Sequence, residues 1–544
     1  MPTFNFASNL RLRARENPRG RAVIAWERGD WRHLTFQELD EESDALARGL
    51  AGLGMRRGMR VILMVPPSLD YFALVYALFK LGATIALVDP GIGRRPLLRC
   101  LEEIGAEAFV GVPGAHLARA FYPALFRSVR IAVTVGPKLL RLGTSLASLR
   151  DPGPFEMEET EVDEPAAILF TSGTTGLPRG AIYTHGTFQA QVEVLRRTFG
   201  IEAGEVDLAT FPPFAFLAPA LGATAVIPDV DARNPGRADP VKVAHAIFTQ
   251  GCTSLVGSPA LLDNLARWAE KHVVALSPLR RVLCSGAPVP FEVLERLSRC
   301  LPPGAEIQVL YGATEALPLA SISAEELLSD TRERTLSGAG VCVGLPIESA
   351  TVRIIRLVDA PIEHWSDELV VPEGEVGEIT VKGPMVTRAY WGGEERNRLA
   401  KIREGGETVH RTGDVGYFDE KGRLWLCGQK AQRVRTATRT LHTICVEEIY
   451  NRHPAVRRTA LVGVQEPGAQ VPVLVVEPEP EARLRSDVLA AELLALGEQH
   501  EPTREIRHIL VYPRPFPLDA RHNAKIHRDL LANWAALRLS GRRA

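Results

Sequence analysis

Short apolar runs alternate with amphipathic stretches along the first half of the chain. The stretches between the runs, such as LDYFALVYALFKLG and PVKVAHAIFTQG, have the pattern of helices. Short apolar runs closed by Gly, Pro or Asp predict buried parallel strands. The runs are RVILMVPP (60–67), TIALVDP (84–90), EAFVGVP (107–113), AAILFTSG (166–173), TAVIPDVD (224–231) and SLVGSP (254–259). This alternation predicts a layered α/β fold, in which ligands bind beyond the carboxyl ends of the strands.

The pattern changes from about residue 340 onward. Segments 374–392 and 415–430 are typical of antiparallel strands, with a hairpin turn at EKGR. Further on, VEEIYNRHPAVRRTALVGV predicts a helix and then a strand, and VLAAELLALGEQH predicts a helix. Between them, PVLVVEPEPEARLRS (472–486) has the Pro and charge punctuation of an exposed loop. We therefore expect a large domain over residues 1–430 and a small α+β domain over residues 431–544.

Size and charge narrow the class of protein. A chain of 544 residues is too long for a single core, which agrees with two domains. The 64 Lys and Arg residues nearly balance the 65 Asp and Glu residues, so the net charge of −1 gives no electrostatic basis for a nucleic-acid partner. Local clusters of Arg near 93–99, 431–439 and 541–543 could still form basic patches.

Neither a membrane span nor an exported protein is predicted. The longest apolar stretch, residues 71–88, is interrupted by Lys80 and Gly82 and is better explained as a buried helix followed by a strand. The N-terminal residues lack the apolar segment of a signal peptide. Seven scattered cysteines without CxxC spacing predict isolated reduced thiols rather than disulfides or a zinc site. We expect a cytoplasmic protein.

One loop has the composition of a phosphate site. In ILFTSGTTGLPRG (168–180), every residue from Thr171 to Gly176 carries a hydroxyl group or is glycine. Glycines let the backbone approach an anion, while N–H groups and hydroxyls donate hydrogen bonds to it. A solvated surface turn explains such a loop equally well, and the Gly-Lys-Ser/Thr ending of a Walker loop is missing.

Three other polar motifs follow in order. YGATE (311–315) combines an aromatic ring, a tight turn, a hydroxyl and a carboxylate. HRTGDVGYFD (410–419) presents Asp414 beside turn glycines, where it could accept hydrogen bonds from a ribose diol. HNAKIHRDLL (522–531) places Lys525 just before a predicted helix. Taken singly, these residues could also be a turn aspartate, a helix-capping glutamate (Glu315) and a solvated surface amine.

Together the motifs resemble those of the adenylate-forming superfamily, which includes acyl-CoA synthetases, adenylation domains of peptide synthetases and luciferases. TSGTTGLPRG resembles its phosphate loop, with Arg179 where the family usually has Lys. SGAP (285–288) and YGATE resemble the adenine-side signatures, RTGD the ribose signature, and NAKIHRDLL the terminal motif. The resemblance spans nearly the whole chain and implies a large domain of layered sheets and helices with a small mobile C-terminal lid.

The resemblance also implies a role for each matching residue. Thr314 would contact the α-phosphate of ATP, Glu315 would hold Mg²⁺, and Lys525 would reach from the small domain to the α-phosphate and the substrate carboxylate. Mg²⁺ and Lys525 would offset the repulsion between two anionic reactants. Asp414 would bind the ribose. The other residues implied to bind ATP are Thr171, Ser172, Gly173, Thr174, Thr175 and Gly176 for the β and γ phosphates, and Gly286, Ala287, Tyr311 and Gly312 for adenine.

Two segments depart from the usual CoA ligase. In GQKAQRVRTATRTLHTICVEEIY (428–450), Gln429 stands where the family has Arg, and Ala431 lies near the expected acidic hinge residue. FPPFAFLAPALG (211–222) is apolar, with Phe214 at or near the usual gate to the CoA tunnel. These departures resemble one branch, the β-lactone synthetases of bacterial long-chain olefin biosynthesis.

That branch implies ATP-dependent activation of a long-chain 2-alkyl-3-hydroxy fatty acid, whose own 3-hydroxyl closes a β-lactone and releases AMP. CoA is not needed, because the nucleophile is tethered. Contact with a membrane surface and assembly with other olefin-pathway enzymes are also conceivable. The alternatives are a long-chain acyl-CoA or acyl-AMP ligase and a non-catalytic relative.

The sequence says less about which residues would surround the alkyl chains and the 3-hydroxyl of the substrate. Phe211, Phe214 and Phe216 are candidates for the walls of the acyl pocket, although ordinary core packing is the better explanation for most of the apolar side chains in this region. A base for the 3-hydroxyl is wanted. His185, in YTHG, is one candidate, but a structural histidine at the start of a helix fits the sequence better.

Overall fold

The fold is described here from a computed structural model of the chain. The residues that the structure describes are 3–88, 92–137, 142–171, 178–210, 214–231, 234–480, 482, 485–518 and 526–540.

A seven-stranded sheet forms one layer of the large N-terminal part, in the order β7-β6-β5-β3-β4-β8-β9. Its strands pair in parallel except for β8 and β9, which are antiparallel. The last two strands flank the Thr/Ser/Gly loop. The strands are β3 (Arg60–Met64), β4 (Thr84–Leu87), β5 (Ala108–Gly111), β6 (Ile131–Thr134), β7 (Thr144–Ser145), β8 (Pro165–Thr171) and β9 (Arg179–Thr184).

A second, longer sheet has the order β17-β18-β20-β21-β16-β15-β14-β13-β12-β10-β11-β1-β2, with β19 paired to β20. Its strands pair in parallel from β14 to β1, and they are antiparallel from β17 to β14 and between β1 and β2. The antiparallel pairing of strands predicted beyond residue 340 is confirmed. The strands are β1 (Arg21–Glu27), β2 (Asp30–Thr35), β10 (Val206–Ala209), β11 (Thr224–Ile227), β12 (Ser254–Gly257), β13 (Arg281–Cys284), β14 (Glu306–Ala313), β15 (Ala316–Ser323), β16 (Val341–Pro346), β17 (Thr351–Ile355), β18 (Gly377–Lys382), β19 (Lys401–Glu404), β20 (Glu407–Phe418) and β21 (Leu424–Gln429).

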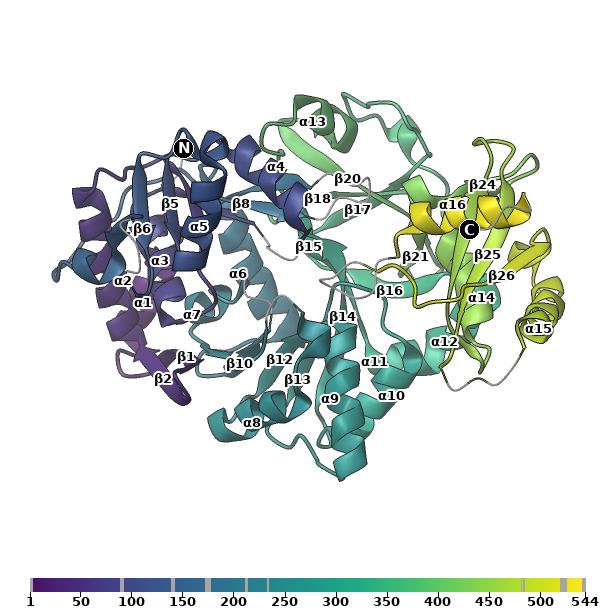
Figure 1. The fold of residues 1–544 in the computed structure, drawn as a ribbon, viewed down its shortest axis with the longest axis horizontal. Coiled ribbons are helices and arrows are strands. Elements are labelled where there is room, and N and C mark those ends of the chain that lie inside the picture. Colours follow the sequence, from purple (N-terminus) through teal and green to yellow (C-terminus); the bar gives the residue numbers. More distant parts are fainter. Residues whose placement is uncertain are drawn as a thin grey trace.

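Helices cover these sheets, as Figure 1 shows, and the α/β fold class is confirmed. They are α1 (Ser8–Glu16), α2 (Phe36–Gly52), α3 (Leu69–Lys80), α4 (Arg94–Ile104), α5 (Pro113–Phe121), α6 (His185–Phe199), α7 (Leu217–Leu221), α8 (Pro240–Gln250), α9 (Pro259–His272), α10 (Phe291–Cys300), α11 (Ala324–Glu326), α12 (Arg332–Arg334) and α13 (Glu394–Ala400). Within the described part of the chain, no helix is both long and apolar enough to cross a membrane.

Lys80 shows how one apolar run accommodates a charge. Helix α3 is buried along nearly its whole length, and the Lys80 side chain has no exposed surface. Its Nζ lies 2.6 Å from Asp40 Oδ1 and 2.5 Å from Asp44 Oδ1, on α2. A buried charge that is paired and hydrogen-bonded avoids most of its desolvation penalty. The residue that interrupts the apolar stretch therefore joins two core helices.

The residues after β21 build a small unit around a three-stranded sheet, β24-β25-β26, seen at the right of Figure 1. The prediction of an exposed loop over residues 472–486 was wrong for its first half, because β25 occupies the centre of this sheet and its apolar side chains are buried there. The elements are the 3₁₀ turn η9 (Lys430–Gln432), β22 (Val434–Arg435), β23 (Thr440–Leu441), α14 (Thr443–Asn451), β24 (Val456–Val464), β25 (Val471–Pro478), α15 (Ser486–Glu498), β26 (His508–Val511) and α16 (Arg528–Leu539).

Candidate active site

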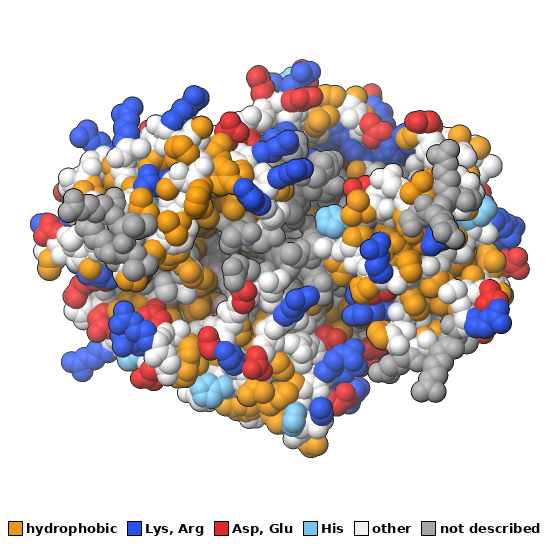
Figure 2. All heavy atoms as spheres, in the orientation of Figure 1, with side chains coloured by type: hydrophobic (Ala, Val, Ile, Leu, Met, Phe, Trp, Pro, Cys, Tyr) orange, Lys and Arg blue, Asp and Glu red, His pale blue; other side chains and the backbone are white. Residues whose placement is uncertain are grey.

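A cleft of about 2100 Å³ lies between the large part and the small C-terminal unit. Figure 2 shows the corresponding face hollowed at its centre. One wall consists of the loops at the carboxyl ends of β13 and β14 together with the middle of β20, and the other consists of α14, β24 and the start of α16. The carboxyl ends of sheet strands are where α/β proteins bind ligands. Most of the described residues singled out by the sequence lie here: Gly286, Ala287, Tyr311, Gly312, Thr314, Glu315 and Asp414.

Tyr311 and Asp414 form a polar pair at the side of this cleft. Tyr311 Oη, on β14, donates a hydrogen bond to Asp414 Oδ2, on β20, at 2.8 Å. Burial of the phenol, together with the neighbouring Asp414 charge, holds the pKa of Tyr311 well above its usual value. Tyr311 therefore remains a donor at neutral pH and fixes the orientation of the carboxylate. The arrangement presents an aromatic ring and an oriented carboxylate side by side.

Two glycines bring backbone close to the cleft. Gly286, in SGAP, has a φ of +103°, which an L side chain rarely adopts. A Cβ at Gly312 would meet the carbonyl oxygen of Ala316 at 2.5 Å, so no side chain fits there. Both positions keep the wall beside Tyr311 flat. A planar ring could therefore stack against backbone there.

Glu315 is held by contacts that the sequence did not reveal. It lies in the turn between β14 and β15 and exposes only 8% of its surface. Tyr390 Oη donates to Glu315 Oε1 at 2.6 Å, and the Thr387 amide donates to the Glu315 carbonyl at 2.9 Å. Burial and the Glu315 charge raise the pKa of Tyr390, so this hydrogen bond persists at neutral pH. The carboxylate is thus pre-oriented, as a metal ligand requires.

Lys401 supplies a buried amine behind this carboxylate. Its Nζ contacts the Thr387 carbonyl, lies 3.2 Å from Thr387 Oγ1, and is 5.3 Å from the centre of the Tyr390 ring. Burial lowers the pKa of Lys401 to about 7, although the Glu315 charge acts in the opposite direction. No motif in the sequence marked Tyr390 or Lys401, because they reach Glu315 only through folding.

Thermal unfolding should reveal this perturbed amine. The pKa of Lys401 is about 7 in the folded chain and about 10.4 in an unfolded one, so the unfolded chain binds more protons between these values. The contribution of Lys401 to the free energy of unfolding therefore rises with pH across this window, by up to about 1.4 kcal/mol per pH unit. Relative to Lys401→Met, the wild-type melting temperature should be lowest at about pH 7 and rise toward about pH 9.5.

The exposed Lys271 on α9 offers the matched control, since Lys271→Met removes an amine that is not buried. A difference between the wild type and Lys401→Met that stays constant with pH would contradict the lowered pKa.

For the Thr/Ser/Gly loop, the structure describes only the residues on either side. Residues Ser172, Gly173, Thr174, Thr175 and Gly176 lie outside the described residues, as does the side chain of Thr171. Arg179, the first residue of β9, lines the cleft with its guanidinium carbon 5.7 Å from the centre of the Tyr390 ring. Backbone hydrogen bonds join β9 to the Tyr390 segment, from Ile182 to Ala389 and from Trp391 to Gly180. The strand that follows the loop is therefore bonded to the segment whose Tyr390 holds Glu315.

The phenylalanines expected around an acyl chain lie in different places. Phe214 lines the cleft, with its ring centre 6.0 Å from that of Tyr183. Phe216 is buried in an aromatic cluster with Phe6, Phe79 and Phe188. Phe211 lies outside the described residues. Tyr183, which no motif singled out, donates from Oη to the Thr314 carbonyl and so connects the cluster to the YGATE turn.

His185 lies in the core at the start of α6. Its side chain has no exposed surface, and its Nδ1 accepts a hydrogen bond from the Phe6 amide at 3.1 Å. Burial lowers the pKa of His185 to about 4. These contacts describe a neutral structural histidine rather than a base open to the cleft.

The connection between the two parts is anchored on both sides. Lys430 Nζ lies 2.8 Å from Glu378 Oε2, which also binds Arg411 at 2.6 Å inside the large part. Two residues further on, Gln432 Oε1 accepts from Arg528 Nε at 3.0 Å, at the start of α16. The chain thus passes from the large part to the small C-terminal unit within η9. Lys525 lies outside the described residues, but the next residue, Ile526, and Arg528 line the cleft.

Comparison with known proteins relates the chain to AMP-binding enzymes. The model of the AMP-binding enzyme family matches residues 10–391. The chain is 49% identical to an olefin beta-lactone synthetase of Stenotrophomonas maltophilia (strain K279a), over 94% of this chain and 92% of that protein. It is 48% identical to an olefin beta-lactone synthetase of Xanthomonas campestris pv. campestris, over 92% of this chain and 91% of that protein.

Among solved structures, the fold resembles o-succinylbenzoate coenzyme A synthetase from Bacillus subtilis in complex with ATP and magnesium ion. The TM-score is 0.75 and the sequence identity 22%, over 97% of this chain and 99% of that one. At this identity the likeness concerns the fold.

Proposed function

Since the chain belongs to the AMP-binding enzyme family, we propose that it converts a long-chain 2-alkyl-3-hydroxy fatty acid into a β-lactone at the expense of ATP. The carboxylate is activated as an acyl-adenylate with loss of pyrophosphate, and ring closure releases AMP. The observation that carries this proposal is the near-complete match, at almost half identity, to two olefin beta-lactone synthetases.

The cleft has the chemistry that a nucleotide requires. Gly286 and Gly312 keep the wall flat beside Tyr311, so that with Ala287 they could frame adenine. The oriented Asp414 carboxylate is an acceptor suited to a ribose diol. Residues 171–176 would receive the β and γ phosphates, and Thr314 would contact the α-phosphate.

The donor set at Glu315 fits a magnesium ion. Mg²⁺ prefers oxygen ligands and usually binds one or two carboxylates together with substrate phosphates. Glu315 offers a pre-oriented carboxylate beside the flanks of the proposed phosphate loop. When bound there, Mg²⁺ would supply positive charge that offsets the repulsion between the two anionic reactants. Tyr390 fixes the carboxylate, and Arg179 adds a cation at the base of the loop.

Lys525 would act from the opposite wall. We propose that residues 431–544 form a lid that turns on the η9 connection and carries Lys525 to the α-phosphate and the substrate carboxylate. The support is positional, since Ile526 and Arg528 line the cleft and Arg528 is bonded to Gln432 on the connection. An ammonium group there would stabilise charge that develops on the phosphoryl oxygens.

The nucleophile for ring closure is the substrate's own 3-hydroxyl. The oxygen of the 3-hydroxyl attacks the acyl carbon, its proton passes to a base or to water, and the bond to the AMP oxygen breaks with AMP as the leaving group. The high effective concentration of a tethered nucleophile helps to offset ring strain. His185 is unsuited as the base, because it is buried in the core.

The reaction is tested by supplying ATP, Mg²⁺ and a racemic 2-alkyl-3-hydroxy fatty acid to the protein in the absence of CoA. The expected products are AMP, pyrophosphate and a β-lactone, identified by nuclear magnetic resonance. The main alternative is a long-chain acyl-CoA or acyl-AMP ligase that transfers the acyl group to a thiol. Thioester formed only with CoA, and no lactone without it, would establish that alternative.

The same proposal bears on the cellular location of the enzyme and on its protein partners. Seven free cysteines, six of them buried, agree with a reducing compartment, and we propose a cytoplasmic location. Because the substrate is produced by carbon–carbon condensation and reduction of long acyl chains, assembly with the enzymes of those steps is also proposed. Co-purification of the neighbouring gene products would test it, and a protein that purifies alone would speak against it.

A further inference from the structure

The surface of α4 and α5 is charged in an unusual way. Residues 108–150 contain no Asp or Glu, although the whole chain has 65 in 544, and they include Arg119, Arg127, Arg130, Lys138, Arg141 and Arg150. The preceding helix α4 begins with Arg94 and Arg95 and continues with Arg99, all three exposed. Among the described residues, none of these three arginines forms an ion pair, unlike many arginines elsewhere in the chain. The arginines of α4 therefore present positive charge that no ion pair among the described residues neutralises, although the exposed Glu102 stands near the other end of that helix. Arg150, by contrast, is paired with Glu42 and Asp70.

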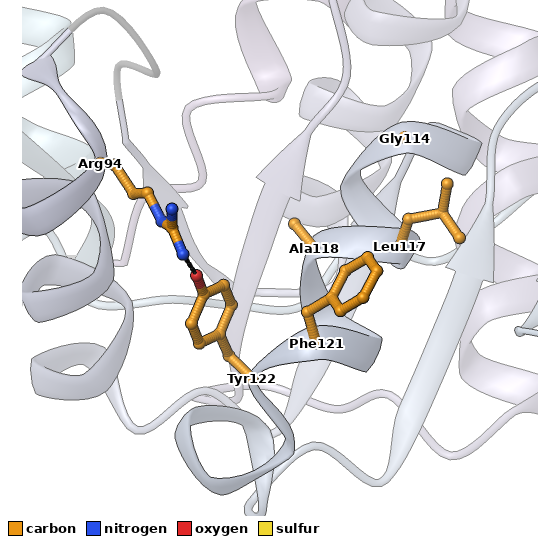
Figure 3. Close-up of a pocket in the computed structure, with 6 residues that line it drawn as sticks. All are labelled: Arg94, Gly114, Leu117, Ala118, Phe121 and Tyr122. Atoms are coloured by element: carbon orange, nitrogen blue, oxygen red, sulfur yellow. Dashed lines mark hydrogen bonds between the residues drawn. The ribbon is translucent and has the colours of Figure 1, made fainter.

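Apolar side chains protrude next to these arginines. Phe121, at the end of α5, exposes 78% of its surface and Leu117, one turn earlier, exposes 44%. Figure 3 shows the two side chains next to each other on α5, with Ala118 on the same helix. Across a shallow hollow of about 560 Å³, Arg94 donates a hydrogen bond to Tyr122 Oη, with its guanidinium carbon 5.6 Å from the Tyr122 ring centre. Adjacent exposed apolar side chains with polar groups at their rim are typical of an interaction surface.

The position of this surface relates it to the cleft. Hydrophobic side chains gather in Figure 2 where Figure 1 places α5, and Lys or Arg side chains lie at the rim of the central hollow, over α4. Helix α4 follows β4, whose neighbour β8 leads into the Thr/Ser/Gly loop. The surface and the mouth of the cleft therefore open on the same face of the molecule.

We propose that α4 and α5 form a docking site for an anionic lipid bilayer. Phe121 and Leu117 would enter the boundary between headgroups and acyl chains, while Arg94, Arg95 and Arg99 would contact lipid phosphates. Surface-bound proteins combine these two features, apolar anchors and unpaired cations, at one interface. A protein partner would more often meet a mixed-charge rim with its own acidic groups. The charge and exposure of this surface do not depend on the function proposed above, although a substrate with two alkyl chains would be delivered from such a membrane.

Sedimentation of the full-length protein with lipid vesicles tests the docking site, without ATP or acyl substrate. We expect binding to phosphatidylcholine vesicles that contain about one-third phosphatidylglycerol, and at most weak binding to phosphatidylcholine alone. Phe121→Ser should reduce binding to the anionic vesicles by about tenfold. Arg95→Glu should reduce it by more than about fivefold, because one cation is lost and one anion gained.

Matched substitutions elsewhere on the surface provide the controls. Phe248 on α8 exposes 41% of its surface, and Arg19 is exposed without an ion pair among the described residues, so Phe248→Ser and Arg19→Glu should bind vesicles like the wild type. Wild-type protein that fails to bind anionic vesicles overturns the proposal, as do equal losses in the controls. A wild-type dimer that Phe121→Ser converts into monomers in light scattering would assign the surface to a second copy of the chain and also overturn it.

Discussion

Replacing Glu315 by alanine is expected to lower the rate of ATP–pyrophosphate exchange by about 100-fold or more, because it removes the proposed magnesium ligand. Tyr390→Phe keeps the carboxylate but loses the 2.6 Å hydrogen bond that orients it, so its loss should be smaller, about tenfold. In both variants the Mg²⁺ concentration needed for half-maximal exchange should rise. The measurement is exchange of labelled pyrophosphate into ATP over a series of Mg²⁺ concentrations.

Glu325 provides the control for Glu315. It is exposed on α11, at the opposite end of β15 from the YGATE turn, and Glu325→Ala should leave both the rate and the Mg²⁺ requirement unchanged. If Glu315→Ala exchanges pyrophosphate with the Mg²⁺ dependence of the wild type, then Glu315 does not hold the metal.

Lys525→Ala is expected to lower adenylation by about 100- to 1000-fold while leaving the affinity for ATP nearly unchanged. The reason is that the amine would contribute mainly to the transition state, where charge develops on the α-phosphate. Interactions made only there lower the rate without weakening ground-state binding. Exchange kinetics give the rate, and calorimetric titration with ATP gives the affinity.

The exposed Lys271 lies on α9, beyond the residues of that helix that line the cleft, and again serves as control, since Lys271→Ala should alter neither quantity. A loss of ATP affinity as large as the loss of rate would show that Lys525 binds the ground state. Unchanged exchange would remove Lys525 from the reaction altogether.

The sequence predicted local structure well and its spatial arrangement poorly. The six apolar runs closed by turn residues are strands, and they pair in parallel where they neighbour one another. Nothing in the runs indicated that β3, β4 and β8 would share one sheet while β10, β11 and β12 join another. Strand length and periodicity report burial on both faces, not the identity of the neighbouring strand.

The same limit applies to the site. The polar motifs identified the cleft residues because each motif is contiguous in sequence. Tyr390 and Lys401 escaped notice because they act on Glu315 from 75 and 86 positions away, and neither stands in a distinctive motif. Segment 472–486 misled for a different reason, since its three prolines and its glutamates suggested a loop although its valines fill the centre of a sheet.

The hydrogen bonds between β9 and the Tyr390 segment mean that the proposed phosphate loop and Glu315, the proposed metal ligand, share one support. Two ligands that bind to a shared element are thermodynamically linked, so each changes the affinity for the other by the same factor. A substitution along β9 would then appear in experiments as an altered demand for magnesium, although the strand touches no ion. Metal dependence can serve in this enzyme as a reporter of the loop.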